Sequence, residues 1–436
     1  MSQLDNSERV VITGMGLVSP IGNTLQDVWE SLSEQRSGVE RIQSLPAEGL
    51  PTSIAAEARG FAGDMDDFGE LDKETKRAIK KGTKMMCREI AMGVAAAQHA
   101  LLSASLTPEK RDPQRTGVVY GSDYIMTLPQ EFADGVRKCL DENQEFQYDR
   151  WAEEGLPKVD PLWLLKYLPN MPASHIAIYN DLRGPNNSIT LRESGSNLAI
   201  GEAYCTIARG SADAIVAGAT GTRVHPFRTV HVALQEELAT GEDAHAASRP
   251  FDLNRTGMVL GEGAGAVVLE RLDHALARGA EILGEIVGHA SSTVMLPTGE
   301  AQCGRALANV LRQSLQNAGL MAGQLGHIHA HGLSTRQGDV EEAQAIADVA
   351  GSGVPVAAGK SYFGNLGAGG GVVELICSVL AMKHNRMFPL LNYTTRDPAC
   401  PIRAAEADED PGDCFVNINV TPQGQAAAVV VKRYDG

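Results

Sequence analysis

Two side chains that could do chemistry together lie far apart along this chain. Glu193 and His331 carry a carboxyl and an imidazole, and such a pair could act as acid and base in hydration, dehydration or hydrolysis. The seven cysteines stand singly, without a C-x-x-C pair, which predicts neither a disulfide framework nor a zinc site. We expect no metal and no cofactor.

The segment after Glu193 predicts how that residue is held. Residues 196–209 have apolar residues at helical spacing and open on small residues, so they predict a buried helix that follows a tight turn. A functional residue in that turn would lie at the helix N-terminus. An α/β fold is indicated because helical segments alternate with short strands, predicted at 9–14, 116–120, 214–218 and 426–432.

Length and composition narrow the class of protein. The 436 residues predict two or three domains or one duplicated fold, and 43% apolar residues can bury a large core. A net charge of −16 argues against general binding to nucleic acid or to an anionic membrane. Because no apolar run reaches the length of a membrane span and the first residues lack the layout of a signal peptide, we expect a cytoplasmic protein.

Several motifs occur in the order known from one enzyme family. They are VVITGMGLVSPIGN (10–23), NMPASHIAI (170–178), GPNNSI (184–189), AIGEAYCTIARGSADAIVAG (199–218), SRPFDLNRTGMVLGEGAGAVVLE (248–270) and HAHGLSTRQGD (329–339). Together they span almost the whole chain. The sequence therefore resembles the β-ketoacyl-acyl-carrier-protein synthases, the elongating condensing enzymes of fatty-acid and polyketide synthesis.

The resemblance implies an α/β thiolase-like fold, duplicated into five α/β/α/β/α layers. The N-terminal half would comprise residues 1–260 and the C-terminal half residues 261–436. Residues 122–172 are rich in charge, aromatics and proline and lack clear periodicity, so we expect an inserted cap over a site.

The family's nucleophile is replaced in this chain. The family carries a cysteine in a T-A-C-x-x-G turn nine residues after G-P, and counting from Gly184-Pro185 puts Glu193 in that position. A carboxylate is a poor substitute because the mixed anhydride it would form is no more stable than the starting thioester. Cys205 lies about 18 Å further along the same helix and is expected to be a small core residue.

Two further motifs imply the remaining site residues. His331-Gly332-Leu333-Ser334-Thr335 and Asp339 resemble the family's H-G-T-x-T-x-x-x-D, so His331 becomes the candidate hydrogen-bond donor to a thioester enolate, supported by Thr335 and Asp339. Lys360 to Asn365 resemble K-S-x-x-G-H. Asn365 stands in place of the second histidine and could donate an amide N–H to an oxyanion, while Lys360 is expected to pair with Glu342.

Residues 417–425 replace the family's flexible G-F-G-G-T-N gate. Branched residues and proline stand here in place of glycines, which removes the backbone freedom that gate opening requires. Loading of an acyl group by movement of this segment is therefore not expected.

A basic stripe precedes these motifs, in an otherwise acidic protein. Spacings of three and four put most of its members on one helical face, and the family uses a basic patch in the corresponding region to dock acyl carrier protein. A solvated helix face is an equally good interpretation of the charges alone. The stripe comprises Lys73, Lys76, Arg77, Lys80, Lys81, Lys84 and Arg88.

Four functions are compatible with these residues, and whether the chain is an enzyme stays open. We rank first a partner subunit like the chain-length factors, which also lack the cysteine and most often carry glutamine there. A malonyl-carrier decarboxylase that uses His331 and Asn365 follows closely. An ordinary β-ketoacyl synthase, an acyltransferase with another nucleophile, ranks third, and an acid/base hydratase or hydrolase of acyl thioesters is the fourth.

The resemblance also implies a dimer, either of this chain alone or with a cysteine-bearing synthase. Family members continue their sheets across a two-fold axis, so GPNNSI (184–189) and AIGEA (199–203) are expected to be buried there. Such an interface would exceed about 2,000 Å² in total. We expect the purified chain to be at least dimeric.

Overall fold

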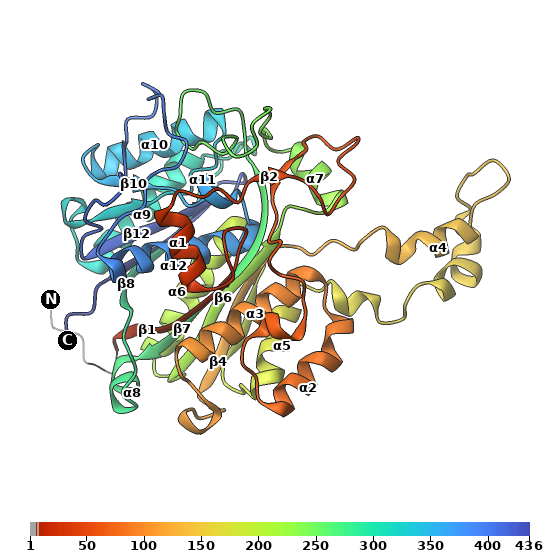
Figure 1. Cartoon of the computed structure of the whole chain (residues 1–436), viewed down its shortest axis with the longest axis horizontal. Coiled ribbons are helices and arrows are strands. Elements are labelled where there is room, and N and C mark those ends of the chain that lie inside the picture. The colour runs from red at the N-terminus through yellow and green to blue at the C-terminus, as the bar shows by residue number, and fades with distance from the viewer. Residues whose placement is uncertain (1–5, 7) are drawn as a thin grey trace.

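The computed structural model describes residue 6 and residues 8–436, and one large mixed sheet runs through this part of the chain (Figure 1). Its strands follow the order β11-β10-β9-β12-β13-β8-β1-β7-β6-β4-β5, with β3 attached to β7 and β2 to β3. The strands are β1 (Val10–Val18), β2 (Glu40–Arg41), β3 (Ile54–Ala56), β4 (Thr116–Ser122), β5 (Asn186–Ile189), β6 (Ala214–Thr222), β7 (Leu260–Arg271), β8 (Gly284–Thr293), β9 (His327–His329), β10 (Pro355–Ala357), β11 (Arg403–Ala404), β12 (Cys414–Val420) and β13 (Gln425–Lys432).

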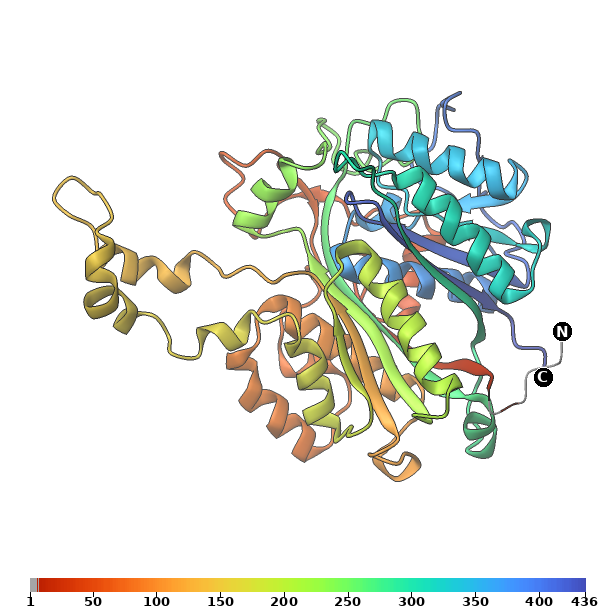
Figure 2. The same cartoon turned by 180° about the vertical axis from the view of Figure 1, so that it is seen from behind.

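The sheet folds into two halves with helices between and outside them (Figures 1 and 2). Helices α6 (Gly195–Ala208) and α12 (Gly370–His384) contact strands of both halves and form the central layer. Helix α3 (Arg88–Ser103) covers β1, β7 and β6 on one outer face, and α9 (Cys303–Ala318) covers β8 and β13 on the other. The predicted order of five α/β/α/β/α layers is confirmed.

The central position of α12 explains its composition. Gly370 to Met382 are all buried, as expected of a helix that is apolar on every side. A Cβ atom on Gly371 would lie only 2.1 Å from Asn419 Oδ1 on β12, so this approach requires glycine. Close packing of this kind brings the two halves together around the candidate site.

The two halves meet later in the chain than predicted. Strand β7 pairs with β6 and β1 and so belongs to the first half, although it begins at Leu260. The second half begins with β8, which joins β1 where Val10–Ile12 pair with Gly284–Ile286. The change from one half to the other therefore falls between Arg271 and Gly284, rather than near residue 260.

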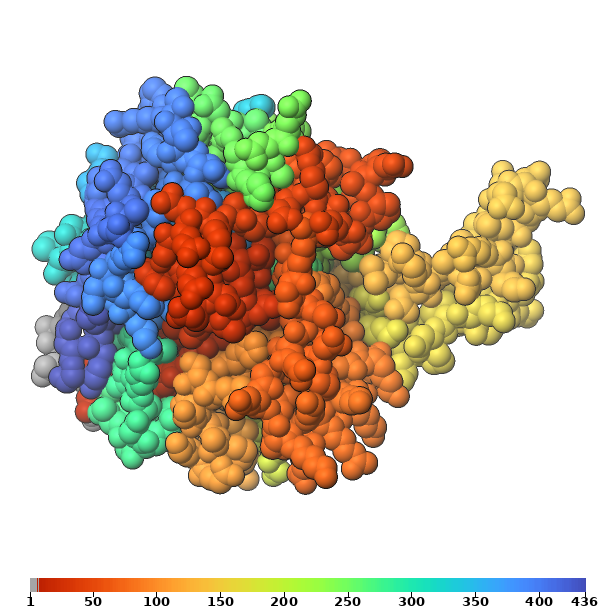
Figure 3. Space-filling model, viewed as in Figure 1, coloured from red at the N-terminus to blue at the C-terminus, as the bar shows by residue number. Residues whose placement is uncertain are grey.

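Residues 123–170, called the arm below, extend away from the body (Figures 1 to 3). The arm leaves β4, carries α4 (Gln130–Lys138) and returns to α5 (Met171–Asn180). Phe132 packs edge-on against Trp163, with ring centres 4.8 Å apart, in a small aromatic core of the arm itself. The sequence predicted a cap over a site, whereas this segment packs on itself and projects outward.

The remaining helices lie on the surface of the body, except α11 (Lys360–Phe363), whose four residues are all buried. Among the described residues, no helix is both long and apolar enough to span a membrane. These helices are α1 (Leu25–Ser33), α2 (Lys73–Gly82), α7 (Pro226–Ala233), α8 (Leu272–Ala277), α10 (Arg336–Ala350) and α11 (Lys360–Phe363).

Candidate functional site

Glu193 lies in the tight turn that the sequence predicts before α6. The turn comprises Arg192–Ser194, α6 follows at Gly195, and the Ser194 hydroxyl donates a hydrogen bond to the Gln425 carbonyl at 2.7 Å. Arg192 has φ +47°, in the left-handed region that few side chains adopt. This turn directs Glu193 inward, where it is 2% exposed.

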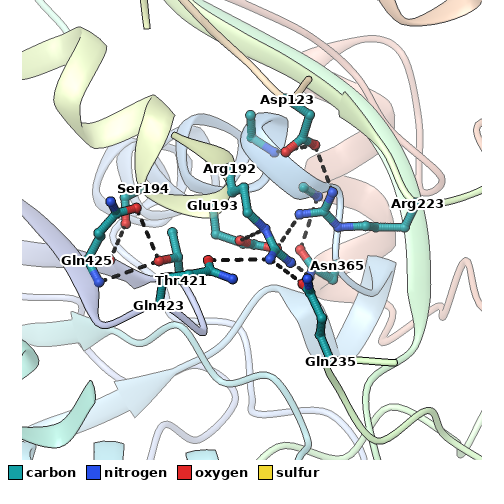
Figure 4. Close-up of polar contacts among 12 residues, drawn as sticks. Asp123, Arg192, Glu193, Ser194, Arg223, Gln235, Asn365, Thr421, Gln423 and Gln425 are labelled. Atoms are coloured by element: carbon teal, nitrogen blue, oxygen red, sulfur yellow. Dashed lines mark hydrogen bonds and ion pairs between the residues drawn. The ribbon is translucent and has the colours of Figure 1, made fainter. Parts of the chain in front are cut away.

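Glu193 belongs to a buried charge network, defined here as Asp123, Glu193, Arg223 and Arg228; Figure 4 shows the first three. Arg223 forms an ion pair with Glu193 through Nη2 and lies 3.0 Å from Asp123 Oδ2 through Nη1. Arg228 Nη1 lies 3.0 Å from the same Asp123 oxygen. All four side chains are buried, and each charge lies beside at least one opposite charge.

The network holds Glu193 ionised. Burial alone would raise the pKa of its carboxyl, but the positive charges of Arg223 and Arg192 outweigh burial and hold that pKa below its usual range. The Nε atom of Arg192 lies 3.4 Å from Glu193 Oε2. The partners of this carboxylate are the side chains of Arg223, Arg192 and Asn365.

Asn365 contacts Glu193, and its side-chain amide group is already bonded to Glu193 and Met258. Its Nδ2 lies 3.1 Å from Glu193 Oε1 and 2.9 Å from the sulfur of Met258. Its Oδ1 accepts a hydrogen bond from Gly367 N at 3.0 Å. An oxyanion would have to displace one of these partners to receive an N–H from Asn365.

His331 follows β9 and is 4% exposed. Lys360 Nζ donates to the His331 carbonyl at 2.8 Å and lies 3.3 Å from Nδ1. Burial, together with the charge of Lys360, holds the pKa of His331 well below its usual value, so the imidazole is neutral.

Lys360 pairs with Glu374 on α12 rather than with Glu342, so the predicted pairing is wrong. Glu342 instead accepts the backbone N–H groups of His331 at 2.6 Å and Gly332 at 2.8 Å. Burial raises the pKa of Glu342 to about 8. Lys360, which pairs with Glu374 on α12, therefore holds the carbonyl of His331. Glu342, on α10, holds the backbone N–H of His331.

Asp339 and Thr335 brace the loop that follows His331. Asp339 Oδ2 accepts the Phe251 N–H at 2.7 Å, and the Thr335 carbonyl accepts Arg255 Nε at 2.9 Å. Both residues support the loop through contacts with residues 251–255. Burial raises the pKa of Asp339 to about 6.

The segment that replaces the family's gate is a regular hairpin. Strands β12 and β13 pair from Cys414 with Lys432 to Val420 with Ala426, and Thr421 N donates to the Gln425 carbonyl at 2.9 Å. Paired strands have less backbone freedom than a glycine loop.

Three members of the charge network were missed by the sequence analysis: Asp123, Arg223 and Arg228. A signal for the first two was available. Asp123 directly follows β4 and Arg223 directly follows β6, and these strands are parallel neighbours. Residues that follow adjacent parallel strands meet at one edge of a sheet, where ligand and active sites of α/β proteins lie.

Cys205 lies on α6, away from the network. Its sulfur is 3.3 Å from His289 Nε2, and the residue is half-buried. Burial raises the pKa of the Cys205 thiol, which opposes a role as nucleophile.

Helix α2 carries most of the predicted basic stripe. Arg88 is not part of it, because it begins α3 and forms an ion pair with Glu262 at 2.7 Å. Lys76 lies 3.6 Å from Asp66 in an exposed pair. We therefore define the basic stripe by the exposed residues on α2 and in the turn that follows it, Lys73, Lys76, Arg77, Lys80, Lys81 and Lys84.

Two family models match the chain one after the other. Residues 7–275 match the model described as "Beta-ketoacyl synthase, N-terminal domain", and residues 280–394 match "Beta-ketoacyl synthase, C-terminal domain". The chain belongs to the β-ketoacyl synthase family. This family acts in fatty-acid and polyketide synthesis, so the resemblance seen in the sequence is confirmed.

Curated relatives match over most of their length. A 3-oxoacyl-[acyl-carrier-protein] synthase 2 from Synechocystis sp. is 33% identical over 401 residues, which cover 91% of this β-ketoacyl synthase homologue and 90% of the relative. A protein of the same name from Staphylococcus aureus (strain COL) is 30% identical over 407 residues, with coverage of 92% and 91%.

Solved structures show the same fold. A β-ketoacyl synthase from Burkholderia phymatum STM815 is 29% identical, with a TM-score of 0.82 and coverage of 98% of this chain and 100% of that chain. The ishigamide ketosynthase/chain length factor is 25% identical, with a TM-score of 0.80 and the same coverage. The thiolase-like fold of this chain is thereby confirmed.

Proposed function

We propose that this β-ketoacyl synthase homologue is a non-condensing partner subunit of the chain-length-factor type, which pairs with a cysteine-bearing synthase. The ion pair between Glu193 and Arg223 carries the proposal, because it occupies the position that the resemblance assigns to the nucleophile. A carboxylate held by arginines is a weak nucleophile, and an acyl group on it would be a labile mixed anhydride.

The enclosure of Glu193 supports the same proposal. Glu193 is 2% exposed and Arg223 1%. Arg192 closes the outer side, because its Nη1 lies 2.6 Å from Gln235 Oε1 and 3.4 Å from Gln423 Oε1 (Figure 4). A substrate would have to break these contacts before reaching the carboxylate.

The first test of the proposal is whether the chain forms an acyl adduct. After incubation with acyl-carrier thioesters, intact-mass measurement of the purified chain should find no added acyl group, because Glu193 is paired and enclosed. A cysteine-bearing synthase treated in parallel serves as the positive control. A stoichiometric acyl adduct on any residue around Glu193 would contradict the proposal and favour ordinary condensation.

An open edge of the sheet supports pairing with another subunit. The sheet ends at β5, where Asn186 and Asn187 are exposed. An unpaired edge strand is a template for a strand of another chain. The ishigamide protein is described as a ketosynthase/chain length factor, and we transfer that kind of pairing to this chain.

We further propose that the basic stripe docks acyl carrier protein. The names of the curated relatives include this carrier, and exposed lysines steer acidic partners at long range. Replacing Lys76 and Lys80 together by glutamate should weaken carrier binding about tenfold or more at low salt. Lys110→Glu, an exposed lysine outside the stripe, is the control. Equal affinities of all these variants, measured by calorimetry, would count against docking at α2.

A malonyl-carrier decarboxylase is the second candidate, and His331 favours it. The imidazole is neutral and enclosed with Glu193 and Asn365, and a neutral imidazole N–H can donate to a thioester enolate. The occupied amide of Asn365 weighs against this candidate.

A further inference from the structure

We propose that the buried charge network fixes the direction in which the arm leaves the body, so that the former nucleophile position serves to orient the arm. Asp123 is both a member of the network and the first residue of the arm, directly after β4. The network therefore joins the turn of Glu193 to the root of the arm (Figures 1 and 4).

Asp123 is held from three directions. Its Oδ2 lies 3.0 Å from Arg223, which follows β6, and 3.0 Å from Arg228 on α7. The same oxygen accepts the Ala368 N–H at 3.3 Å, from the loop that precedes α12. Because Asp123 is fully buried, rotation of its backbone would separate a buried carboxylate from both Arg223 and Arg228.

Tyr124 extends this anchor by one residue. The guanidinium carbon of Arg228 lies 4.7 Å from the centre of the Tyr124 ring, and the Tyr124 hydroxyl forms a hydrogen bond with His231 on α7. The first two residues of the arm are thus tied to α7 by an ion pair, a cation–π contact and a hydrogen bond.

The far end of the arm has a separate attachment. The carbonyl of Pro169 accepts hydrogen bonds from the hydroxyls of Ser122 at 2.8 Å and Ser188 at 3.1 Å. The outer part of the arm around α4 is clear of the body (Figures 2 and 3), whereas the returning residues Trp163–Lys166 contact Thr83–Met85. A small rotation of the backbone at Asp123 would therefore displace the tip of the arm by a large distance.

The orientation of the arm matters because the arm exposes seven apolar side chains among its charged ones. We take the arm to contact the partner synthase, a step that rests on the proposed function, because isolated apolar surface of this kind favours burial against another chain. Its exposed apolar residues are Leu128, Val136, Phe146, Tyr148, Leu156, Leu162 and Leu164.

Hydrogen exchange of the full-length chain, read by mass spectrometry, tests the anchor. Asp123→Asn should speed amide exchange of residues 124–128 about tenfold or more, since a hydrogen bond to a charged group is weakened. Glu193→Gln should also speed amide exchange of residues 124–128, but by a smaller factor, because it acts on Asp123 only through Arg223. The matched control is Asp213→Asn, which weakens a carboxylate held by Arg115 and Arg271 at the opposite end of β6.

Tyr124→Leu keeps the test decisive if Asp123→Asn fails to fold, because it leaves every charge in place. Tyr124→Leu should speed amide exchange of residues 124–128 without changing amide exchange in the peptides around Glu193. Unchanged exchange at 124–128 in Glu193→Gln, or in Tyr124→Leu, would overturn the proposal. Exchange is measured on the chain alone, so its result is independent of whether a partner synthase binds.

Discussion

Replacing Arg223 with methionine should lower the free energy of unfolding by about 3–5 kcal/mol, the usual cost of removing one partner from a buried ion pair. Arg223 is the only group described here that contacts both Glu193 and Asp123, so the variant leaves two carboxylates buried with weakened compensation. Urea denaturation followed by circular dichroism measures this loss.

Two further variants separate this effect from a general loss of charge. Arg183→Met removes an exposed pair with Asp181 and should cost less than about 1 kcal/mol. Adding Glu193→Gln to Arg223→Met should recover part of the loss, because one orphan charge is removed. A loss for Arg223→Met no larger than that for Arg183→Met would show that the pair is not an important element of the structure.

Any release of carbon dioxide from a malonyl carrier should depend on His331 and slow at least about a hundredfold in His331→Ala. Loss of one oxyanion donor raises a barrier by about 2.7–4 kcal/mol. His331 is the relevant donor because the amide hydrogens of Asn365 are taken by Glu193 and Met258. The release is followed by mass spectrometry of the carrier.

His289→Ala provides a matched control, because His289 is a half-buried histidine beside Cys205 and outside the site. It should leave the rate unchanged. Equal rates in His331→Ala and the parent chain would place the chemistry at other residues. No release by the parent chain would leave the partner-subunit proposal as the better account.

The position of Glu193 was predictable because it depends on local sequence. A tight turn, small residues and helical spacing after it are enough to predict an inward-facing residue at the start of α6. The five layers followed from the resemblance, and burial of α12 agrees with its apolar composition on every side.

The partners of the buried charges were not predictable in the same way. Lys360 pairs with Glu374 rather than Glu342, although both acids are buried, because only packing decides which carboxylate the ammonium reaches. The sequence also held no sign that residues 123–170 project outward. Their helices pack on one another, and that choice depends on aromatic contacts between residues far apart in the arm.

Arg223 is intermediate between the predictable position of Glu193 and the unpredictable pairing of Lys360. Its place directly after β6 could have been combined with that of Asp123 after β4 if the two strands had been taken as neighbours. A lone arginine has many possible partners, so the pairing of strands had to be known before the pairing of charges.

Co-expression with a cysteine-bearing synthase from the same genome, followed by size-exclusion chromatography and native mass spectrometry, tests the central claim most directly. The chain expressed alone should be at least dimeric, because its β5 edge is open. In the mixture, the account predicts a complex of one copy of each chain as the main species. Exclusive self-pairing of this chain in the presence of the synthase would contradict the partner-subunit proposal.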